Sequence, residues 1–316
     1  MREALKVTDG RPVAVVGAGL VGSGWAVVFA RAGLPVRLFD TRPEAMDAAM
    51  ATCANQLAGL EKHGLLTEAV GDILSRMTPV ASLGEAVEGV AYVQESVLER
   101  KAVKRALMEE LDIHSHHGFV VGSSASGIPA SEFALELSIS PRVLIAHPVN
   151  PPSLVPLVVL VPSPATSTDT VAFAAELMRA IGQSVVHVRK EIEGFVLNRL
   201  QAVLLREAWA LVEDGIATCE DVDRAVRDGL GWRWSFMGPF ETIDLNAPGG
   251  IADYARRLGG LYRSIAKSRL NDKAWDEPLI CEVERQRRLQ LPLEHFIERL
   301  AWRDEHLMQF ATTRGR

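Results

Sequence analysis

The hydrophobic positions of the chain follow two patterns, and the change between them falls near residue 193. Before it, short apolar runs rich in β-branched residues alternate with stretches in which apolar residues recur at helical spacing. The predicted strands contain residues 13–16, 36–39, 119–121, 143–145, 157–161 and 185–188. Because strands and helices alternate, we expect βαβ units that form a mainly parallel sheet in an α/β fold.

Beyond residue 193 the strand signals end, and the pattern is typical of consecutive helices separated by glycine and proline. We therefore expect an α/β domain for cofactor binding over residues 1–192 and an all-helical domain for substrate binding and dimerisation over residues 193–316. The first predicted helix of the second domain, at residues 193–214, has apolar side chains on nearly every face. Because a helix without a polar face must be covered on all sides, this pattern favours a homodimer in which a second copy covers part of it.

A glycine-rich turn follows the first predicted strand directly. The sequence GAGLVG at residues 17–22 has the GxGxxG spacing, and a helix pattern follows it. In this context the motif indicates a Rossmann-type dinucleotide site, because its glycines permit a tight turn and a close approach of the backbone to a pyrophosphate. A turn that only connects strand and helix is the structural alternative. The predicted cofactor-binding residues of the turn are Gly17, Gly19, Leu20, Val21 and Gly22.

An acidic residue, Asp40, ends the second predicted strand, at about the distance from the glycine motif where a ribose-binding carboxylate belongs. Such a carboxylate accepts hydrogen bonds from the adenosine ribose and repels a 2′-phosphate. NAD is therefore the expected cofactor and NADP the less favoured one. Arg42, two positions later, is the residue that keeps NADP open as an alternative.

Two predicted strands end in residues that are able to take part in proton transfer. In an open α/β sheet ligands bind beyond the carboxyl ends of the strands. One strand runs into the serine-rich residues 123–127, and the other runs into His147-Pro148. A histidine held at a strand end is a candidate general acid or base near neutral pH. On this pattern alone, a structural histidine is an equally good interpretation.

Several motifs in a fixed order resemble one known family. They are AHPVNPP at residues 146–152, GFVLNRLQ at 194–201, EAW at 207–209 and Gly-Pro at 238–239 followed by Glu-Thr. Together with the glycine motif, they resemble the 3-hydroxyacyl-CoA dehydrogenase superfamily over nearly the whole chain. Within the superfamily, the closest resemblance is to its lambda-crystallin branch, the L-gulonate 3-dehydrogenases. This implies an NAD-dependent oxidoreductase that acts on a 3-hydroxy acid.

The resemblance also implies roles for individual residues. His147 matches the general base that removes the hydroxyl proton, and Ser126 and Asn198 match residues that hydrogen-bond the reacting oxygen. Ser126 and Asn198 also have structural alternatives. Ser126 can cap a helix, and Asn198 can be a hydrogen-bonded polar residue in a packed helix. The further implied contacts are Glu99 and Lys104 to the cofactor and Asn150 near the nicotinamide and substrate. The structural alternative for Asn150 is that it shapes a proline-rich turn.

The chain departs from the family at the partner of the histidine. The family has a glutamate twelve residues after it, which orients the imidazole, whereas this chain has Val159. Three explanations stay open: a substitute carboxylate such as Glu241 or Asp244, a weakened alcohol dehydrogenase, or a substrate that needs no strong base. The last of these motivates an NAD(P)H-dependent imine reductase or amine-forming enzyme as an alternative. A crystallin-like structural protein with residual nucleotide binding is a second alternative.

A second departure is the sequence Trp232-Arg233-Trp234, for which the lambda-crystallin pattern has smaller or more polar neighbours. Arg233 is a candidate clamp for a substrate carboxylate, because a guanidinium pairs with it through two parallel hydrogen bonds. The two tryptophans are either substrate-binding residues or packing residues. His114, His116 and His117 lie before a strand start, away from the expected crevice, and we expect no metal site.

Composition narrows the class of protein and its partners. The 316 residues are 48% hydrophobic and carry a formal charge of -6, which indicates a folded protein without the excess of cations that nucleic acid binding requires. We expect a small-molecule substrate and neither a nucleic acid nor a membrane partner. Three scattered cysteines and the lack of a long apolar run favour a cytoplasmic protein.

Overall fold

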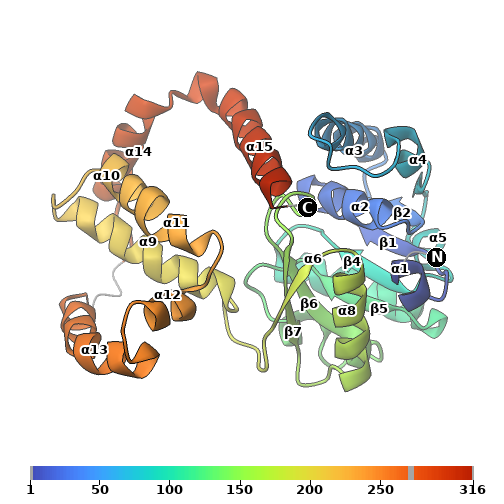
Figure 1. Cartoon of the computed structure of the whole chain (residues 1–316). Coiled ribbons are helices and arrows are strands. Elements are labelled where there is room, and N and C mark those ends of the chain that lie inside the picture. The colour runs from blue at the N-terminus through green and yellow to red at the C-terminus, as the bar shows by residue number, and fades with distance from the viewer. Residues whose placement is uncertain (1–2, 270–273, 315–316) are drawn as a thin grey trace. The chain divides into compact units, whose positions relative to one another are not determined.

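The computed structural model describes residues 3–269 and 274–314, and its contacts divide the chain into two units. The first contains the residues up to Arg199 and those from Leu300 onward, and the second is Leu200–Arg299 (Figure 1). The assignment of residues 1–192 to cofactor binding and of 193–316 to substrate binding stays a prediction.

The first unit is built on an eight-stranded sheet with the order β3-β2-β1-β4-β5-β6-β7-β8. Six strands are parallel, β7 is antiparallel to β6, and β8 is parallel to β7. This confirms the expected α/β fold with a mainly parallel sheet. The strands are β1 (Val13–Val16), β2 (Val36–Phe39), β3 (Met77–Pro79), β4 (Tyr92–Glu95), β5 (Val120–Ser123), β6 (Val143–Pro148), β7 (Leu157–Pro162) and β8 (Ser184–His187).

Helices cover both faces of this sheet, as a parallel sheet requires (Figure 1). Alternate residues of each strand therefore enter two separate cores: Val158 packs with Trp25 and Phe29, whereas Val159 packs with Phe119 and Phe195. The helical segments of the first unit are α1 (Glu3–Val7), α2 (Leu20–Arg31), α3 (Glu44–Lys62), α4 (Val70–Leu74), α5 (Leu83–Val87), α6 (Lys101–Ile113), η1 (Ser115–His117), α7 (Ser131–Ala134), η2 (Ser140–Arg142) and α8 (Thr168–Ala180).

The second unit is helical, which confirms the predicted change of pattern. Its first helix, α9 (Leu197–Glu213), begins at the end of the first unit, and its last, α15 (Phe296–Thr313), ends back in it. Lys62 and His63 both lie close to Glu305 of α15. The segments between these helices are α10 (Cys219–Arg224), η3 (Ala225–Leu230), α11 (Gly231–Trp234), α12 (Pro239–Leu245), α13 (Gly250–Ser268), α14 (Glu277–Gln290) and η4 (Leu293–His295).

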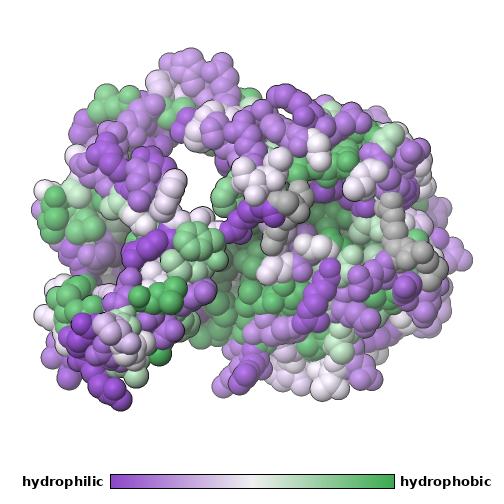
Figure 2. Space-filling view, viewed as in Figure 1, coloured by the Kyte–Doolittle hydropathy of each residue, from purple (hydrophilic) through white to green (hydrophobic). Residues whose placement is uncertain are grey.

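The apolar side chains of α9 are largely uncovered in the single chain. Leu200 is 61% exposed and Val203 is 72% exposed, whereas Val212 is buried. Apolar side chains are also visible on the surface of the helical unit in Figure 2. Within the described residues, no helix is both long and apolar enough to cross a membrane.

Candidate active site

The strand order reverses between β1 and β4, so the chain connections on either side run in opposite directions. At such a switch point the loops beyond the carboxyl ends of the two strands separate and leave a crevice for a ligand. The glycine motif follows β1 there, and Ser96 follows β4. The sheet thus places the predicted cofactor turn and the segment from Glu95 to Glu99 next to each other.

The turn after β1 has the geometry that a diphosphate requires. Gly17 has a φ of +97°, and a Cβ atom on it would lie 2.5 Å from the carbonyl oxygen of Ser96. A Cβ atom on Gly22 would lie 1.9 Å from the carbonyl oxygen of Gly17. Gly19 is the N-cap residue directly before α2, has open space where a Cβ atom would lie, and offers no side chain as a cap. The N-terminus of α2 is therefore open to an anion, and NAD fits this turn.

Leu20 and Val21, the other two predicted residues of the turn, form the first turn of α2. The side chain of Leu20 is 71% exposed, and Val21 packs partly against the core. Their contribution to a cofactor site would therefore come from their backbone N–H groups, which have no intrahelical acceptor at this end of a helix.

Asp40 lies directly beside the glycine turn. Its Oδ2 atom accepts a hydrogen bond of 2.9 Å from the backbone N–H of Ala18, and its Oδ1 atom accepts from the backbone and side chain of Arg42. Partial burial by itself would raise the pKa of Asp40, but these hydrogen bonds and the charge of Arg42 outweigh it and lower the pKa below its ordinary value. The carboxylate is thus held ionised where a ribose is expected.

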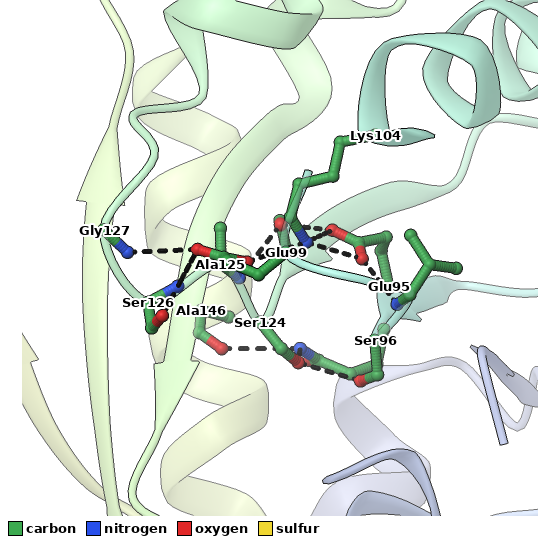
Figure 3. Close-up of polar contacts among 12 residues, drawn as sticks. Glu95, Ser96, Glu99, Lys104, Ser124, Ala125, Ser126, Gly127 and Ala146 are labelled. Carbon is green, nitrogen blue, oxygen red and sulfur yellow. Dashed lines mark hydrogen bonds and ion pairs between the residues drawn. The ribbon is translucent and has the colours of Figure 1, made fainter. Parts of the chain in front are cut away.

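A buried charged cluster lies at the end of β4 (Figure 3). The Nζ atom of Lys104 donates to both carboxylate oxygens of Glu95 at 2.9 Å and lies 3.3 Å from Glu99. The hydroxyl group of Ser123 also donates to Glu95. Lys104 and Glu95 are 1% and 0% exposed, so water screens this pair very little. The structure therefore brings the predicted residues Glu99 and Lys104 together.

Glu99 connects the cluster to the loop after β5. Its Oε1 atom accepts hydrogen bonds from the backbone N–H groups of Ser126 and Gly127, at 2.7 and 3.2 Å, and from the hydroxyl group of Ser126 at 3.2 Å. Figure 3 shows Glu99 between this loop and Lys104. Burial would raise the pKa of Glu99, but the charge of Lys104 and the backbone hydrogen bonds outweigh it and lower the pKa. Glu99 is thus ionised, and it fixes the position of Ser126.

Sequence analysis missed several polar residues of this edge. Besides Glu95 and Ser123, the side chain of Gln94 donates to Ser124 at 2.8 Å and to the carbonyl oxygen of Ala146 at 3.4 Å, and Ser96 hydrogen-bonds Ser124. These contacts tie the ends of β4, β5 and β6 together (Figure 3). The available signal was the polar pair Gln94-Glu95 directly after the apolar residues 90–93.

His147 lies at the end of β6 and is 7% exposed. Burial lowers its pKa below the ordinary value of histidine, and the negative charge of Glu99 raises it in part. In the antiparallel pair of β6 and β7, His147 stands directly opposite Val159, which is 1% exposed. The Nδ1 atom of His147 is buried and has no hydrogen-bond partner among the described residues. The position at which the family has an orienting carboxylate is therefore apolar in this chain.

Asn198 reaches the same loop from the other side, because its Nδ2 atom donates to the carbonyl oxygen of Ser126. The structure thus brings Ser126 and Asn198 together at the carboxyl edge of the sheet. The ring of Phe195, shortly before α9, lies 6.0 Å from the ring of His147. Asn150 follows β6, precedes a cis peptide bond to Pro151 and is exposed.

The remaining predicted residues lie in the second unit. Trp232, Arg233 and Trp234 form α11, in which the two tryptophans are 74% and 40% exposed. Asp244, a candidate substitute carboxylate, accepts a hydrogen bond of 2.7 Å from the backbone of Ile251 at the start of α13. Glu241 lies in the first turn of α12. Their roles in substrate binding or catalysis stay predictions.

The histidines before β5 belong to a turn at the amino edge of the sheet. Two of them, His116 and His117, have ring centroids 4.0 Å apart and lie in η1. Over the residues that the structure describes, no group of three or more His, Cys, Asp or Glu side chains is arranged to hold a metal ion.

Comparison with known proteins agrees with this geometry. The family model described as 3-hydroxyacyl-CoA dehydrogenase, NAD binding domain, matches residues 12–192, and the model of the C-terminal domain of the same family matches residues 194–279. Fold and site define an NAD-dependent oxidoreductase with a Rossmann domain. The chain belongs to the 3-hydroxyacyl-CoA dehydrogenase family.

Individual relatives refine this classification. The chain is 40% identical to lambda-crystallin of Oryctolagus cuniculus, over 95% of each protein, and 40% identical to L-carnitine dehydrogenase of Pseudomonas aeruginosa, over 76% of this chain and 74% of that protein. Among solved structures, a 5-formyl-3-hydroxy-2-methylpyridine 4-carboxylic acid 5-dehydrogenase, an NAD+ dependent dismutase, has a TM-score of 0.80 with 28% identity and covers 95% of this chain and 96% of that chain. The predicted resemblance to the superfamily and to lambda-crystallin is thus confirmed.

The contacts of Asp40 predict how cofactor preference changes when its carboxylate is removed. Asp40→Ser should weaken NADH binding by about tenfold, because the charged acceptor for the ribose hydroxyls is lost. NADPH binding should strengthen, since Arg42 is then released to pair with the 2′-phosphate. Fluorescence titration of both cofactors measures the two effects. In the control, Asp40→Ser combined with Arg42→Gln, the gain for NADPH should be smaller, because only the repulsion by Asp40 has been removed, and a gain as large as in Asp40→Ser alone would contradict the role of Arg42.

The pairing of His147 with Val159 predicts that a carboxylate at position 159 strengthens the base. Val159→Glu should raise the rate of alcohol oxidation by about tenfold or more and move the acidic limb of its pH profile to higher pH, because the carboxylate favours the imidazolium and fixes the tautomer. Stopped-flow measurement of NADH formation across pH tests this. Val159→Gln, which offers a hydrogen bond without a charge, is the matched control and should leave the limb near its original pH.

Proposed function

We propose that the chain oxidises the hydroxyl group of a 3-hydroxy acid of the L-gulonate type, with transfer of a hydride to NAD. The observation that carries this proposal is the arrangement of His147, Ser126 and Asn198 at the carboxyl edge of the sheet, the edge at which the glycine turn opens. A base and hydrogen-bond donors at this edge are what oxidation of a secondary alcohol requires.

In the proposed reaction, neutral His147 takes the hydroxyl proton on its Nε2 atom. The amide group of Asn198 donates to the oxygen as negative charge develops on it, and the hydroxyl group of Ser126 does so once its proton turns from Glu99 to the substrate. Bound NAD supplies the hydride acceptor. Glu99 keeps Ser126 in place through three hydrogen bonds to the loop. Asn150 and Arg233 bind the polar groups of the substrate, and Trp232 and Trp234 bind its carbon skeleton.

The relatives support a 3-hydroxy acid as the substrate class. They include L-carnitine dehydrogenases and a 3-hydroxyacyl-CoA dehydrogenase that is 37% identical over 85% of this chain. Carnitine is an acid with a hydroxyl group on its third carbon, and 3-hydroxyacyl-CoA is a thioester with a hydroxyl group at the same place. If Trp232 and Trp234 line the substrate site and are not packing residues, they favour a substrate acid that is bulkier and flatter than gulonate.

One observation favours a second candidate function, reduction of a protonated imine with NADH or NADPH. Among the described residues the Nδ1 atom of His147 has no hydrogen-bond partner, and burial lowers the pKa of His147, which makes it a weaker base than an ordinary histidine. A protonated imine carries its own proton and accepts a hydride without a strong base.

The third candidate is a structural protein that binds the nucleotide without useful turnover. The described cysteines are free, which supports the proposal of a cytoplasmic protein.

The proposed function predicts the substrates that change the absorbance of NADH. With NAD, L-gulonate and 3-hydroxybutyrate should give rising absorbance, and His147→Asn should reduce the initial rate by about a hundredfold or more while NADH binding persists. Oxidation of NADH or NADPH by cyclic imines, without turnover of the hydroxy acids, would instead establish the second candidate. Cofactor binding with no turnover of either class would leave the structural role.

The exposed apolar side chains of α9 support a homodimer, with the helical domain as its interface. We expect sedimentation velocity to give the mass of two chains. Val203→Asp should shift the protein to a single chain, because it places a charge on the apolar face of α9. Ile113→Asp, which changes an equally exposed apolar residue of the first unit, is the control and should leave the mass unchanged. A monomeric wild-type protein would overturn this part of the proposal.

A further inference from the structure

A series of hydrogen bonds leads from the interior of the sheet to the edge at which the glycine turn lies. It begins at Tyr92, which is 0% exposed and donates its hydroxyl proton to the Oε1 atom of Gln94 at 2.8 Å. The Nε2 atom of Gln94 donates to the hydroxyl group of Ser124 at 2.8 Å. The hydroxyl groups of Ser124 and Ser96 are also 2.8 Å apart, and Figure 3 shows the contact between these two residues.

The orientation of the Gln94 amide group follows from the atoms around it. Its Nε2 atom lies 3.4 Å from the carbonyl oxygen of Ala146, and a carbonyl oxygen only accepts hydrogen bonds. A reversed amide would place two oxygen atoms against each other there. It would also leave the proton of the buried Tyr92 hydroxyl group without an acceptor. Gln94 therefore donates to Ser124 and does not accept from it.

This orientation decides the direction in which the two serine protons point. A hydroxyl group has one proton to donate. Because Ser124 accepts from Gln94, its proton is directed to Ser96, the other partner of its hydroxyl group among the described residues. Ser96 is half-buried and accepts this bond, and over the described part of the chain its own proton has no acceptor. The hydroxyl group of Ser96 is therefore a donor for a ligand.

The strand order indicates which part of NAD this donor faces. The ends of β2, β1 and β4 lie side by side in that order, so the glycine turn after β1 has Asp40 on one side and Ser96 on the other. The backbone N–H group of Ser96 donates to the carbonyl oxygen of Val16 at 2.7 Å, which holds Ser96 beside the turn. In a dinucleotide fold, an acidic residue at the position of Asp40 binds the adenosine ribose, and the turn binds the diphosphate. The ribose that carries the nicotinamide then lies on the side of Ser96.

We propose that Ser96 binds NAD by donating a hydrogen bond to a hydroxyl oxygen of the nicotinamide ribose, and that Gln94 and Ser124 are positioning residues that direct its proton there. The proposal gives a function to the polar end of β4, whose side chains are otherwise surrounded by the apolar strands of the sheet. It concerns the cofactor alone, so it depends neither on the identity of the substrate nor on His147 as the base.

The test compares three ligands by isothermal titration calorimetry in the absence of substrate. NADH and ADP-ribose contain the second ribose, whereas ADP ends at the diphosphate. Ser96→Ala should weaken the binding of NADH and of ADP-ribose by about three- to tenfold, the effect of one lost hydrogen bond, and should leave the binding of ADP unchanged. Ser163→Ala, which removes a buried hydroxyl group bonded to Thr166 after β7, is the matched control and should change none of the three.

A double-mutant cycle tests the two positioning residues. Ser124→Ala leaves the hydroxyl group of Ser96 without the donor that orients it, and should weaken ADP-ribose binding by about twofold. In the Ser96→Ala background the same change should have no further effect, because Ser124 acts through Ser96. Gln94→Met combined with Tyr92→Phe removes the amide together with the buried hydroxyl group that would lose its partner, and should behave like Ser124→Ala. A merely structural effect would weaken ADP as much as ADP-ribose.

Three results would overturn the inference. Equal weakening of ADP and ADP-ribose in Ser96→Ala would assign the hydroxyl group to the diphosphate. Unchanged binding of NADH and ADP-ribose would mean that the proton of Ser96 reaches no part of the cofactor. A loss in Ser124→Ala that persists in the Ser96→Ala background would remove the positioning role. Because calorimetry measures binding without substrate, failure of the proposed function shows separately, as absence of turnover with the hydroxy acids.

Discussion

The close approach of Gly17 to Ser96 is the constraint on which the rest of the site depends. Only a residue without a Cβ atom fits there, since such an atom would lie 2.5 Å from the Ser96 carbonyl oxygen. This contact holds the turn after β1 against the end of β4, so the cofactor turn and the carboxylates of Glu95 and Glu99 share one edge. The strand order places the turn after β1 near the segment after β4. The glycine then allows the two backbones to touch, because it has no Cβ atom.

At that edge, polar contacts hold the loops in place, whereas apolar side chains pack the rest of the sheet. Glu95 and Lys104 are buried and paired, Glu99 holds the loop of Ser126, and Asn198 holds the same loop from the segment that begins α9. A buried ion pair gives little net stability compared with an apolar pair of the same size. Its contacts instead fix where Glu99 lies, because Lys104 binds Glu95 and also lies 3.3 Å from Glu99.

The sequence predicts the parts of the molecule in which local pattern and burial agree. β1 and β7 are continuous apolar runs, and the glycine motif has its characteristic spacing, so these were predictable. β3 and β4 have no counterpart among the predicted strands. β3 has three residues, two of them exposed, and β4 contains Gln94 and Glu95, which are buried and hydrogen-bond Ser124 and Ser123, about thirty residues further along the chain. Likewise, the pairing of Glu305 with Lys62 has no local signal. Long-range polar contacts decide these cases, and hydrophobic periodicity does not detect them.

The substitution at position 159 separates two tasks that one carboxylate performs elsewhere in the family. A carboxylate beside Nδ1 supplies a negative charge, and it also accepts a hydrogen bond that fixes the tautomer of the imidazole. A charge acts over several ångströms, and the negative charge of Glu99 raises the pKa of His147 in part, against the larger effect of burial. A hydrogen bond requires contact, and Val159 offers none. His147 therefore keeps part of its basicity but not its fixed orientation, and this loss matters least for a substrate that brings its own proton.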